Sequence, residues 1–296
     1  MTTPVPGGPT GLLVVDKEAG WTSHDVVARV RGAFGQRRVG HAGTLDPDAT
    51  GVLLVGLGRV TRVLRYLTAL GKEYTAEIVL GVATDTLDAS GEVVAGWDMS
   101  AVTLEDARAA AAGLTGLVRQ IPPMVSAVKV GGRRLHELAR RGLEVERPVR
   151  TVRVDRFDLE ATGEPQVLRA RVACSSGTYV RTLAADLGAA LGGGAHLRHL
   201  RRTRVGSFTL DEAQTVAALD VSSVRSPAEA LRDLDRVTVG PEVTQLVALG
   251  RPLDGEPLGA TGDGPWALVD PTGRLLAVYE RTTAHRIRPA VVLASR

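Results

Sequence analysis

The chain has 296 residues, of which 44% are apolar and 23% are charged, and its formal net charge is +3. The apolar fraction is typical of packed globular proteins, and the length suffices for one large domain plus a small one. The sequence predicts no membrane-spanning helix, because no apolar run approaches the roughly 20 residues that such a helix needs.

The sequence also lacks a signal pattern and a second cysteine, which bears on the cellular compartment and on disulfide or metal chemistry. Residues 1–10 carry no basic-then-apolar signal pattern, so we expect a cytoplasmic protein. The single cysteine, Cys174, cannot form an internal disulfide or a cysteine metal cluster, and we expect a small buried apolar residue there.

Strand-like and helix-like patterns alternate irregularly along the chain. Strands are expected at residues 11–15, 74–80, 149–159 and 167–173. Helices are expected at residues 23–34 with Ser23 as N-cap, at 59–70, at 103–113, from near Thr178, and by spacing alone within 211–235. Because no regular βαβ rhythm appears, the pattern indicates an α+β fold rather than a doubly wound sheet.

A domain boundary is expected near residues 237–241. Beyond it, short apolar runs are separated by turn residues, and Asp270-Pro271-Thr272-Gly273 is typical of a tight hairpin. The sequence therefore predicts a main domain of residues 1–237 and a small β-barrel formed by residues 241–296.

One irregular loop precedes an apolar strand-like run. The segment from His41 to Gly51, HAGTLDPDATG, contains two glycines, a proline and two acids. Glycine permits close backbone approach and proline fixes one φ angle, so a carboxylate between them is presented with little freedom. Asp46 is that carboxylate. The alternative interpretation is an Asx-type turn in which Asp46 only caps the residues that follow it.

Basic residues are concentrated in two stretches. Residues 119–156 hold ten Lys or Arg against four Asp or Glu, and residues 198–204 hold four arginines and no acid. Such clusters are the usual footprint of a polyanion, and RNA is the natural candidate, although basic clusters also solvate ordinary surfaces. Pro122-Pro123 and Gly131-Gly132 mark residues 121–150 as a basic insertion.

Five motifs carry a resemblance to a known family. They are Asp16-Lys17 with Gly20-Trp21-Thr22-Ser23, the loop from Gly43 to Gly51, Lys72-Glu73-Tyr74, the turn from Gly81 to Asp88, and the segment from Cys174 to Thr182. In this order they resemble the motifs of the TruB family of pseudouridine synthases, which act on uridine 55 of tRNA. Five ordered motifs are far more specific than any one of them.

The resemblance implies the fold, the reaction and the partners. The fold would be a long mixed, mainly antiparallel sheet flanked by helices, with a PUA-like RNA-binding domain at residues 241–296. The reaction would be base flipping, glycosidic cleavage and rejoining of uracil through C5, without metal or cofactor. The partner would be the T-arm of tRNA, clamped by residues 121–150. No obligatory protein partner is expected, and a monomer is the default.

Three residues match the family's catalytic groups. Asp46 matches the nucleophile, and whether it attacks ribose C1′ or uracil C6, or removes a ribose proton to give a glycal, stays open. Arg181 matches the arginine that keeps this carboxylate ionised and oriented. Tyr74 matches the tyrosine that stacks on uracil and assists removal of the C5 proton.

Other residues are expected to bind the substrate or to support the site. His41 matches the histidine associated with the flipped base, and Lys17 is expected to support the loop or a phosphate. Tyr179 is expected under the cleft, and Arg140 and Arg141 are expected to bind RNA. The acids of the turn at residues 85–88 are expected to fix that turn rather than to touch substrate.

The sequence departs from the family pattern at Glu18, Val125 and His136, which affects the first loop and the basic insertion. Two alternatives stay open. One is a guide-RNA-dependent pseudouridine synthase that needs partner proteins, and the other is a tRNA-folding chaperone whose carboxylate is dispensable. A P-loop nucleotide enzyme is excluded, because no G-x-x-x-x-G-K-[ST] occurs.

Overall fold

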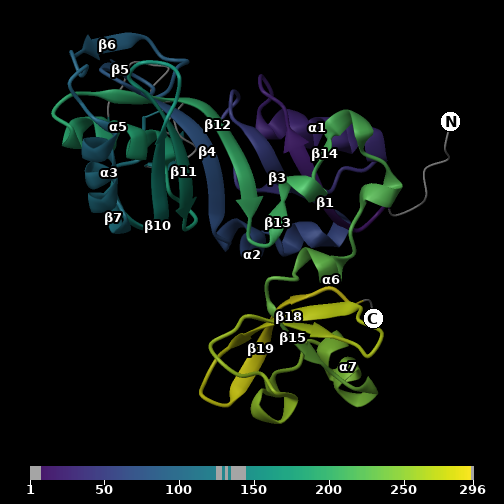
Figure 1. The fold of residues 1–296 in the computed structure, drawn as a ribbon. Helices are drawn as coiled ribbons and strands as arrows, with labels where there is room; N and C mark the ends of the chain where they lie inside the picture. The colour runs from purple at the N-terminus through teal and green to yellow at the C-terminus, as the bar shows by residue number, and fades with distance from the viewer. Residues whose placement is uncertain (1–7, 125–128, 131–132, 135–144, 295–296) are drawn as a thin grey trace.

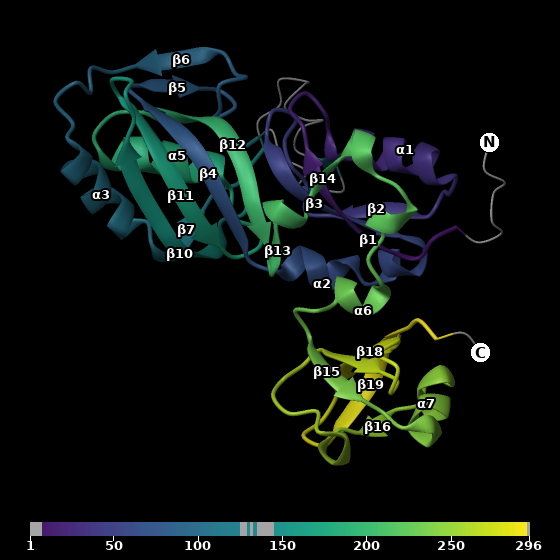
Figure 2. The same cartoon turned by 45° about the vertical axis from the view of Figure 1, so that its right-hand side comes forward.

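A ten-stranded sheet runs through the larger domain of the computed structural model, which describes residues 8–124, 129–130, 133–134 and 145–294 (Figures 1 and 2). Its main path runs in the order β14-β1-β3-β12-β4-β11-β10-β7, and β2 and β13 pair with β3 and β12. The strands are β1 Gly11–Lys17, β2 Val39–Ala42, β3 Thr50–Leu57, β4 Lys72–Leu80, β7 Gly116–Gln120, β10 Arg150–Ala161, β11 Val167–Cys174, β12 Ala195–Val205, β13 Phe208–Thr209 and β14 Gln214–Thr215.

The sheet is mixed and mainly antiparallel, as expected. Only the pairs β1–β14 and β3–β12 are parallel. The expected strands are all present, and β1 extends to Lys17, two residues further than the apolar run suggested. Two small hairpins lie outside the sheet: β5 Val82–Thr84 with β6 Val93–Gly96, and β8 Lys129–Val130 with β9 Arg133–Arg134, the latter inside the expected insertion.

Three of the expected helices form around their capping signals. Helix α1 (Ser23–Phe34) begins one residue away from the expected cap: Thr22 is the N-cap and forms a capping box with Asp25, whereas Ser23 lies inside the helix. Helix α3 (Leu104–Gly113) begins after the N-cap Thr103, as expected. Helix α5 (Val180–Ala190) follows the N-cap Tyr179.

Two helix predictions are wrong in part. The segment 59–70 is not one helix but a 3₁₀ turn, η1 (Gly58–Arg62), followed by α2 (Leu64–Ala69), because Val63 between them leaves helical geometry. The segment 211–235 contains short 3₁₀ turns and only the four-residue α6 (Pro227–Ala230). There, side chains such as that of Asp220, which accepts from the N–H groups of Ser222 and Ser223, close turns locally and compete with a continuous helix.

The smaller domain is a five-stranded sheet in the order β15-β17-β18-β19-β16, with helix α7 (Pro241–Ala248) and the 3₁₀ turn η5 (Glu256–Leu258) beside it. Its strands are β15 Asp235–Thr238, β16 Leu253–Asp254, β17 Trp266–Val269, β18 Leu275–Arg281 and β19 Arg286–Val292. The expected hairpin joins β17 to β18, with Gly273 at positive φ. Because β15 pairs with β17, the second sheet begins at Asp235, before the expected boundary.

The two domains share an apolar core below α2. Val63 and Leu67 belong to the same buried cluster as Leu275 and Leu293 of the second sheet. Polar contacts continue this interface: Arg59 and Arg62 donate to the carbonyls of Leu293 and Val292, and Glu280 pairs with Arg65 and accepts from Tyr66. The second sheet is therefore packed against the first domain rather than tethered to it (Figure 1). No helix among the described residues is long and apolar enough to cross a membrane.

Candidate active site

The loop that carries Asp46 connects the antiparallel strands β2 and β3 and is fixed by buried side chains from elsewhere in the chain. Ser23 on α1 is 1% exposed, and its hydroxyl accepts from the N–H of Leu45 (2.9 Å) and donates to its carbonyl (3.2 Å). Because Ser23 lies inside the helix and not at its cap, its hydroxyl is available to hold Leu45, the residue that precedes Asp46.

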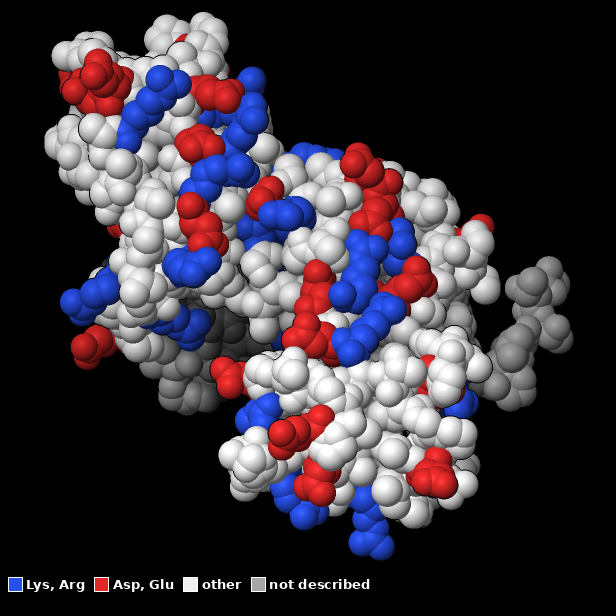
Figure 3. All heavy atoms as spheres, turned by 60° about the horizontal axis from the view of Figure 1, so that its bottom comes forward, with Lys and Arg blue, Asp and Glu red and all other residues white. Residues whose placement is uncertain are grey.

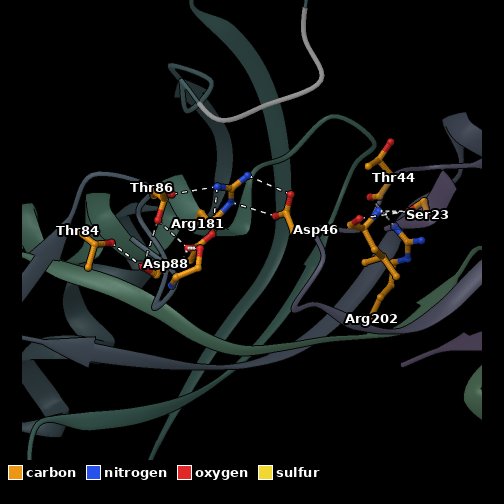
Figure 4. Close-up of polar contacts among 10 residues, drawn as sticks. Ser23, Thr44, Asp46, Thr84, Thr86, Asp88, Arg181 and Arg202 are labelled. Atoms are coloured by element: carbon orange, nitrogen blue, oxygen red, sulfur yellow. Dashed lines mark hydrogen bonds and ion pairs between the residues drawn. The ribbon is translucent and has the colours of Figure 1, made fainter. Parts of the chain in front are cut away.

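Arg202 on β12 joins the two ends of the loop (Figure 4). Its side chain is 1% exposed and donates to the carbonyls of Gly43 (3.0 Å), Thr44 (3.4 Å) and Val52 (2.7 Å). The backbone of β12 also approaches Gly51 so closely that a Cβ there would lie 2.1 Å from the Arg202 carbonyl oxygen. Glycine is required at this position both by that approach and by its φ of +101°.

Lys17 holds the middle of the loop. Its side chain is fully buried, and Nζ donates to the carbonyls of Glu18 (2.9 Å), Trp21 (2.6 Å) and Pro47 (2.9 Å). An ammonium group has three N–H donors, so all of them are used within the protein. Of the roles expected for Lys17, this geometry favours support of the loop over contact with a phosphate or plain surface solvation. Its assignment as a substrate-binding residue stays a prediction.

Arg181 lies between two carboxylates (Figure 4). Its Nε and Nη2 lie 3.1 and 3.2 Å from the two oxygens of Asp46, a fork-shaped pairing that fixes the carboxylate plane. Its Nη1 lies 3.0 Å from the Thr86 carbonyl and 3.2 Å from Oδ2 of Asp88. The side chain of Arg181 is 5% exposed, whereas that of Asp46 is 41% exposed, so the carboxylate faces open space and the guanidinium does not.

Asp88 has a double role that the sequence indicated only in part. Its Oδ1 accepts from the Thr86 hydroxyl and from the N–H and hydroxyl of Ser90, which fixes the turn as expected. Its Oδ2 faces Arg181, so the same side chain also orients the arginine.

The surroundings of Asp46 act on its charge in opposite directions. Partial desolvation of the carboxylate by the surrounding protein raises the pKa of Asp46 above its ordinary value. The Arg181 guanidinium lowers that pKa, and the nearby carboxylate of Asp88 raises it. The arginine therefore opposes the effect of desolvation and favours the ionised form of the carboxylate.

A pocket of about 260 Å³ opens beside this carboxylate. It is lined by Asp46, Tyr74, Tyr179 and Arg181, which were expected at the site, and by Lys72, Leu200 and Arg202, which were not. Burial raises the pKa of the Tyr74 hydroxyl, and the Arg202 guanidinium opposes this shift. Tyr179 is placed by Gln120, whose buried amide accepts from its N–H (3.0 Å) and donates to its carbonyl (3.3 Å).

His41 lies on β2 at the start of the loop and outside the lining of this pocket. Its ring meets that of His24 edge-on, with centroids 5.4 Å apart. Nδ1 of His41 is buried and has no hydrogen-bond partner among the residues that the structure describes, and burial lowers the pKa of the ring to about 4. His41 is therefore a neutral side chain at pH 7.

The two basic stretches, residues 119–156 and 198–204, differ in what the structure says of their arginines. Arg140 and Arg141 lie outside the described residues. Contact of residues 198–204 with a polyanion stays a prediction, but among the described residues their four arginines do not form an uncompensated patch. Pairing within the fold is the reason: Arg198 contacts Glu77 and Glu164, Arg201 contacts Asp16, Arg204 contacts Glu73, and Arg202 is buried in the loop. On the face shown in Figure 3, basic and acidic side chains lie beside one another.

Sequence reasoning did not single out Arg202, Lys72 or Ser23 as site residues. Ser23 and Lys72 stand inside the recognised motifs, so the motif itself was a usable signal. Arg202 gave a different signal, since a charged residue in an otherwise strand-like segment is a candidate for a buried, fully bonded side chain. Its contacts with the loop span about 150 residues and follow only from the sheet order.

Comparison with known proteins places this geometry in a family. The model of the N-terminal domain of TruB family pseudouridylate synthase matches residues 31–180, and the model of the tRNA pseudouridylate synthase B C-terminal domain matches residues 181–242. Proteins named tRNA pseudouridine synthase B from Corynebacterium aurimucosum and Mycobacterium avium are 51% and 48% identical. The first alignment covers 92% of each chain and the second 96% of each.

The fold also matches a solved structure. A chain of a Cbf5-Nop10-Gar1 complex superposes with a TM-score of 0.76 at 26% identity, over 97% of this chain and 86% of that one. The sequence matches and the superposition agree, and the chain belongs to the TruB family of pseudouridylate synthases.

Proposed function

We propose that this protein converts uridine 55 in the T-arm of tRNA to pseudouridine, with Asp46 as nucleophile. The observation that carries the proposal is the forked pairing of Asp46 with the buried Arg181 at the edge of a pocket that Tyr74 also lines. The target tRNA follows from the names of the relatives, and the position of the uridine from the family resemblance.

The reaction breaks the C1′–N1 bond, turns the uracil in place, joins C5 to C1′, releases the C5 proton and places a proton on N1. It is an internal rearrangement with no net oxidation or reduction, so the amino acid side chains can supply its acid, base and nucleophile. Asp46 either bonds to C1′ or C6, or removes a ribose proton. Each of these steps needs the ionised carboxylate that Arg181 maintains.

Tyr74 assists at the last step. Its ring lines the pocket, where it can stack on uracil, and its hydroxyl assists loss of the C5 proton. Because burial keeps the phenol neutral, a nearby cation is needed to stabilise any phenolate, and Arg202 is in position to do so. Tyr179, positioned by Gln120, closes another side of the pocket.

RNA recognition involves three further parts of the chain. The basic segment of residues 121–150, with Arg140 and Arg141, grips the T-arm. His41, neutral and beside the loop, occupies the region vacated when the base is flipped. The five-stranded C-terminal sheet acts as a PUA-like RNA-binding domain, held in a fixed orientation by the shared core. The protein works in the cytoplasm as a monomer, without an obligatory protein partner.

A guide-RNA-dependent synthase is the second candidate, because the superposed chain comes from a complex with Nop10 and Gar1. The identities favour the stand-alone enzyme, since the relatives named tRNA pseudouridine synthase B reach 51% against 26% for that chain. A tRNA-folding chaperone is compatible with the same surface, because flipping a base requires opening tRNA tertiary contacts.

The test uses purified protein without added metal or cofactor and an unmodified tRNA transcript tritiated at uridine C5. We expect release of tritium, and its loss when the single T-arm uridine is replaced. Tight binding without release would contradict the stand-alone activity and would favour the guide-dependent or the chaperone interpretation.

A further inference from the structure

Two lysines are buried near the catalytic loop, and their environments differ. Lys17 is fully buried and Lys72 is 6% exposed, and burial lowers the pKa of both to about 8. For Lys17, the carboxylates of Asp48 and Asp46 oppose this shift, whereas no carboxylate does so for Lys72. A buried ammonium without a counter-charge is unfavourable unless something else fills that role.

The hydrogen bonds of Lys72 are incomplete among the described residues. Its Nζ donates to the carbonyls of Thr68 (2.5 Å) and Leu70 (2.6 Å), at the end of α2. An ammonium has three N–H donors, so one is left. Unlike Lys17, Lys72 lines the 260 Å³ pocket that also contains Asp46 and Tyr74.

A second cation lies beside Lys72. A Cβ placed on Gly43 would lie 3.8 Å from Cε of Lys72 and 3.5 Å from Nη1 of Arg202, so the two side chains meet at this glycine. Neither Lys72 nor Arg202 forms a salt bridge with another residue in the described part of the chain. The neighbouring titratable groups, Tyr74 and Cys174, are neutral, because burial raises both pKa values, that of Cys174 to about 11.

Among the described residues, this end of the pocket therefore holds two cations, Lys72 and Arg202, and no anion that pairs with them. The geometry suits a ligand that becomes negative while it is bound, and the proposed reaction produces one. When the C1′–N1 bond breaks, its electron pair stays with the uracil and spreads over N1 and the ring oxygens. Attack of Asp46 on C6 likewise places negative charge on the ring oxygens.

We propose that Lys72 donates its remaining N–H to the uracil ring and, together with Arg202, stabilises the negative charge that the ring carries during the reaction. This inference rests on the proposed function. The ring loses its negative charge when C5 bonds to C1′, and loss of the C5 proton with gain of a proton at N1 then completes the product, so the two cations act electrostatically and exchange no electrons. The competing explanation is that Lys72 only caps α2 through Thr68 and Leu70.

The decisive experiment varies the leaving group. tRNA transcripts containing either uridine or 5-fluorouridine react under single-turnover conditions, and the loss of the N1-linked target nucleoside is quantified after digestion. This readout follows glycosidic cleavage alone, because 5-fluorouridine has no C5 proton to release. Fluorine makes the detached ring a more stable anion and reduces its need for a cation. Loss of one preorganised donor of this kind costs about 100-fold, so we expect Lys72→Met to be slowed about 100-fold on uridine and about 10-fold or less on 5-fluorouridine.

The matched control is Lys17→Met, which removes the other buried lysine and loosens the loop. Its rate loss should be equal on the two substrates, because loop position does not depend on the leaving group. An equal loss for Lys72→Met on both substrates, with a lowered melting temperature, would overturn the proposal in favour of the capping role. A wild-type protein inactive on uridine would instead refute the proposed function.

The pH dependence of kcat/KM gives an independent test. Because Lys72 has a pKa of about 8, activity should fall as pH rises through 8. Lys17 titrates in the same range, so Lys72→Arg separates them: arginine stays charged, and the alkaline fall that remains should be smaller and displaced to higher pH. An unchanged alkaline profile in an active Lys72→Arg variant would contradict the role of Lys72.

Discussion

The two sides of the pocket are charged in opposite ways. On one side a single guanidinium, that of Arg181, contacts the two carboxylates of Asp46 and Asp88. On the other side Lys72 and Arg202 have no carboxylate partner among the described residues. The first arrangement is complete in the free protein and fixes the orientation of the nucleophile. The second is incomplete until a negatively charged ring is present, and so favours the reacting state over the resting one.

Of the changes considered on the side of the pocket where Arg181 contacts Asp46 and Asp88, Arg181→Lys should have the largest effect. Lysine keeps the charge but cannot contact both oxygens of Asp46, the Thr86 carbonyl and Asp88 together. We expect kcat to fall about 1,000-fold while tRNA affinity stays within a few fold. Single-turnover tritium release and filter binding measure the two quantities. A variant with near-normal kcat would mean that charge alone, and not the fork, is required.

The change Asp88→Asn tests the second carboxylate. Asparagine can keep the turn contacts with Thr86 and Ser90 but removes the negative charge beside Arg181. We expect kcat to fall about 10- to 100-fold, with a folded protein by circular dichroism. Loss of folding with this nearly isosteric change would show that Asp88 matters for the turn alone.

Support of the loop is tested by Ser23→Ala. The variant leaves the N–H and carbonyl of Leu45 without their buried partner. We expect the free energy of unfolding in urea to fall by about 1–2 kcal/mol and kcat to fall about 10-fold. Thr22→Ala is the control, because it removes the true N-cap of α1 and should lower stability without a matching loss of kcat.

Burial lowers the pKa of His41, and no step of the reaction is assigned to this residue. Its pKa is lowered to about 4, so between about pH 4 and 6.5 the unfolded chain binds a proton that the folded chain does not. Stability should therefore fall as pH falls through this window, by up to about 3 kcal/mol from this residue. Urea unfolding of wild type and His41→Leu at pH 7 and 4.5 checks it. Equal acid sensitivity of the two proteins would contradict the assignment.

Much of this structure could be predicted from local sequence. The strands, the helix cap at Thr103, the hairpin at Asp270 and the pairing of Asp46 with Arg181 follow from short patterns or from recognised motifs. What these features share is that the deciding residues lie close together, or stand inside a motif whose partner is known.

The remaining features depend on contacts between distant segments. The run of residues 198–204 reads as a basic patch, but its acids come from β1, β4 and the turn before β11. Arg202 and Lys72 look like ordinary strand residues until the sheet order places them beside the loop. The helical spacing of residues 211–235 competes with local side-chain turns, and spacing alone does not decide that competition.

The central claim is that the carboxylate of Asp46 is the reacting group, and Asp46→Asn tests it most directly. The side chain is nearly isosteric, so tRNA affinity should stay within a few fold of wild type. Tritium release from a C5-labelled tRNA should fall below detection, at least about 10,000-fold, because the neutral amide is neither a nucleophile nor a base. Turnover by a homogeneous Asp46→Asn protein would contradict the account and assign the chemistry to another group.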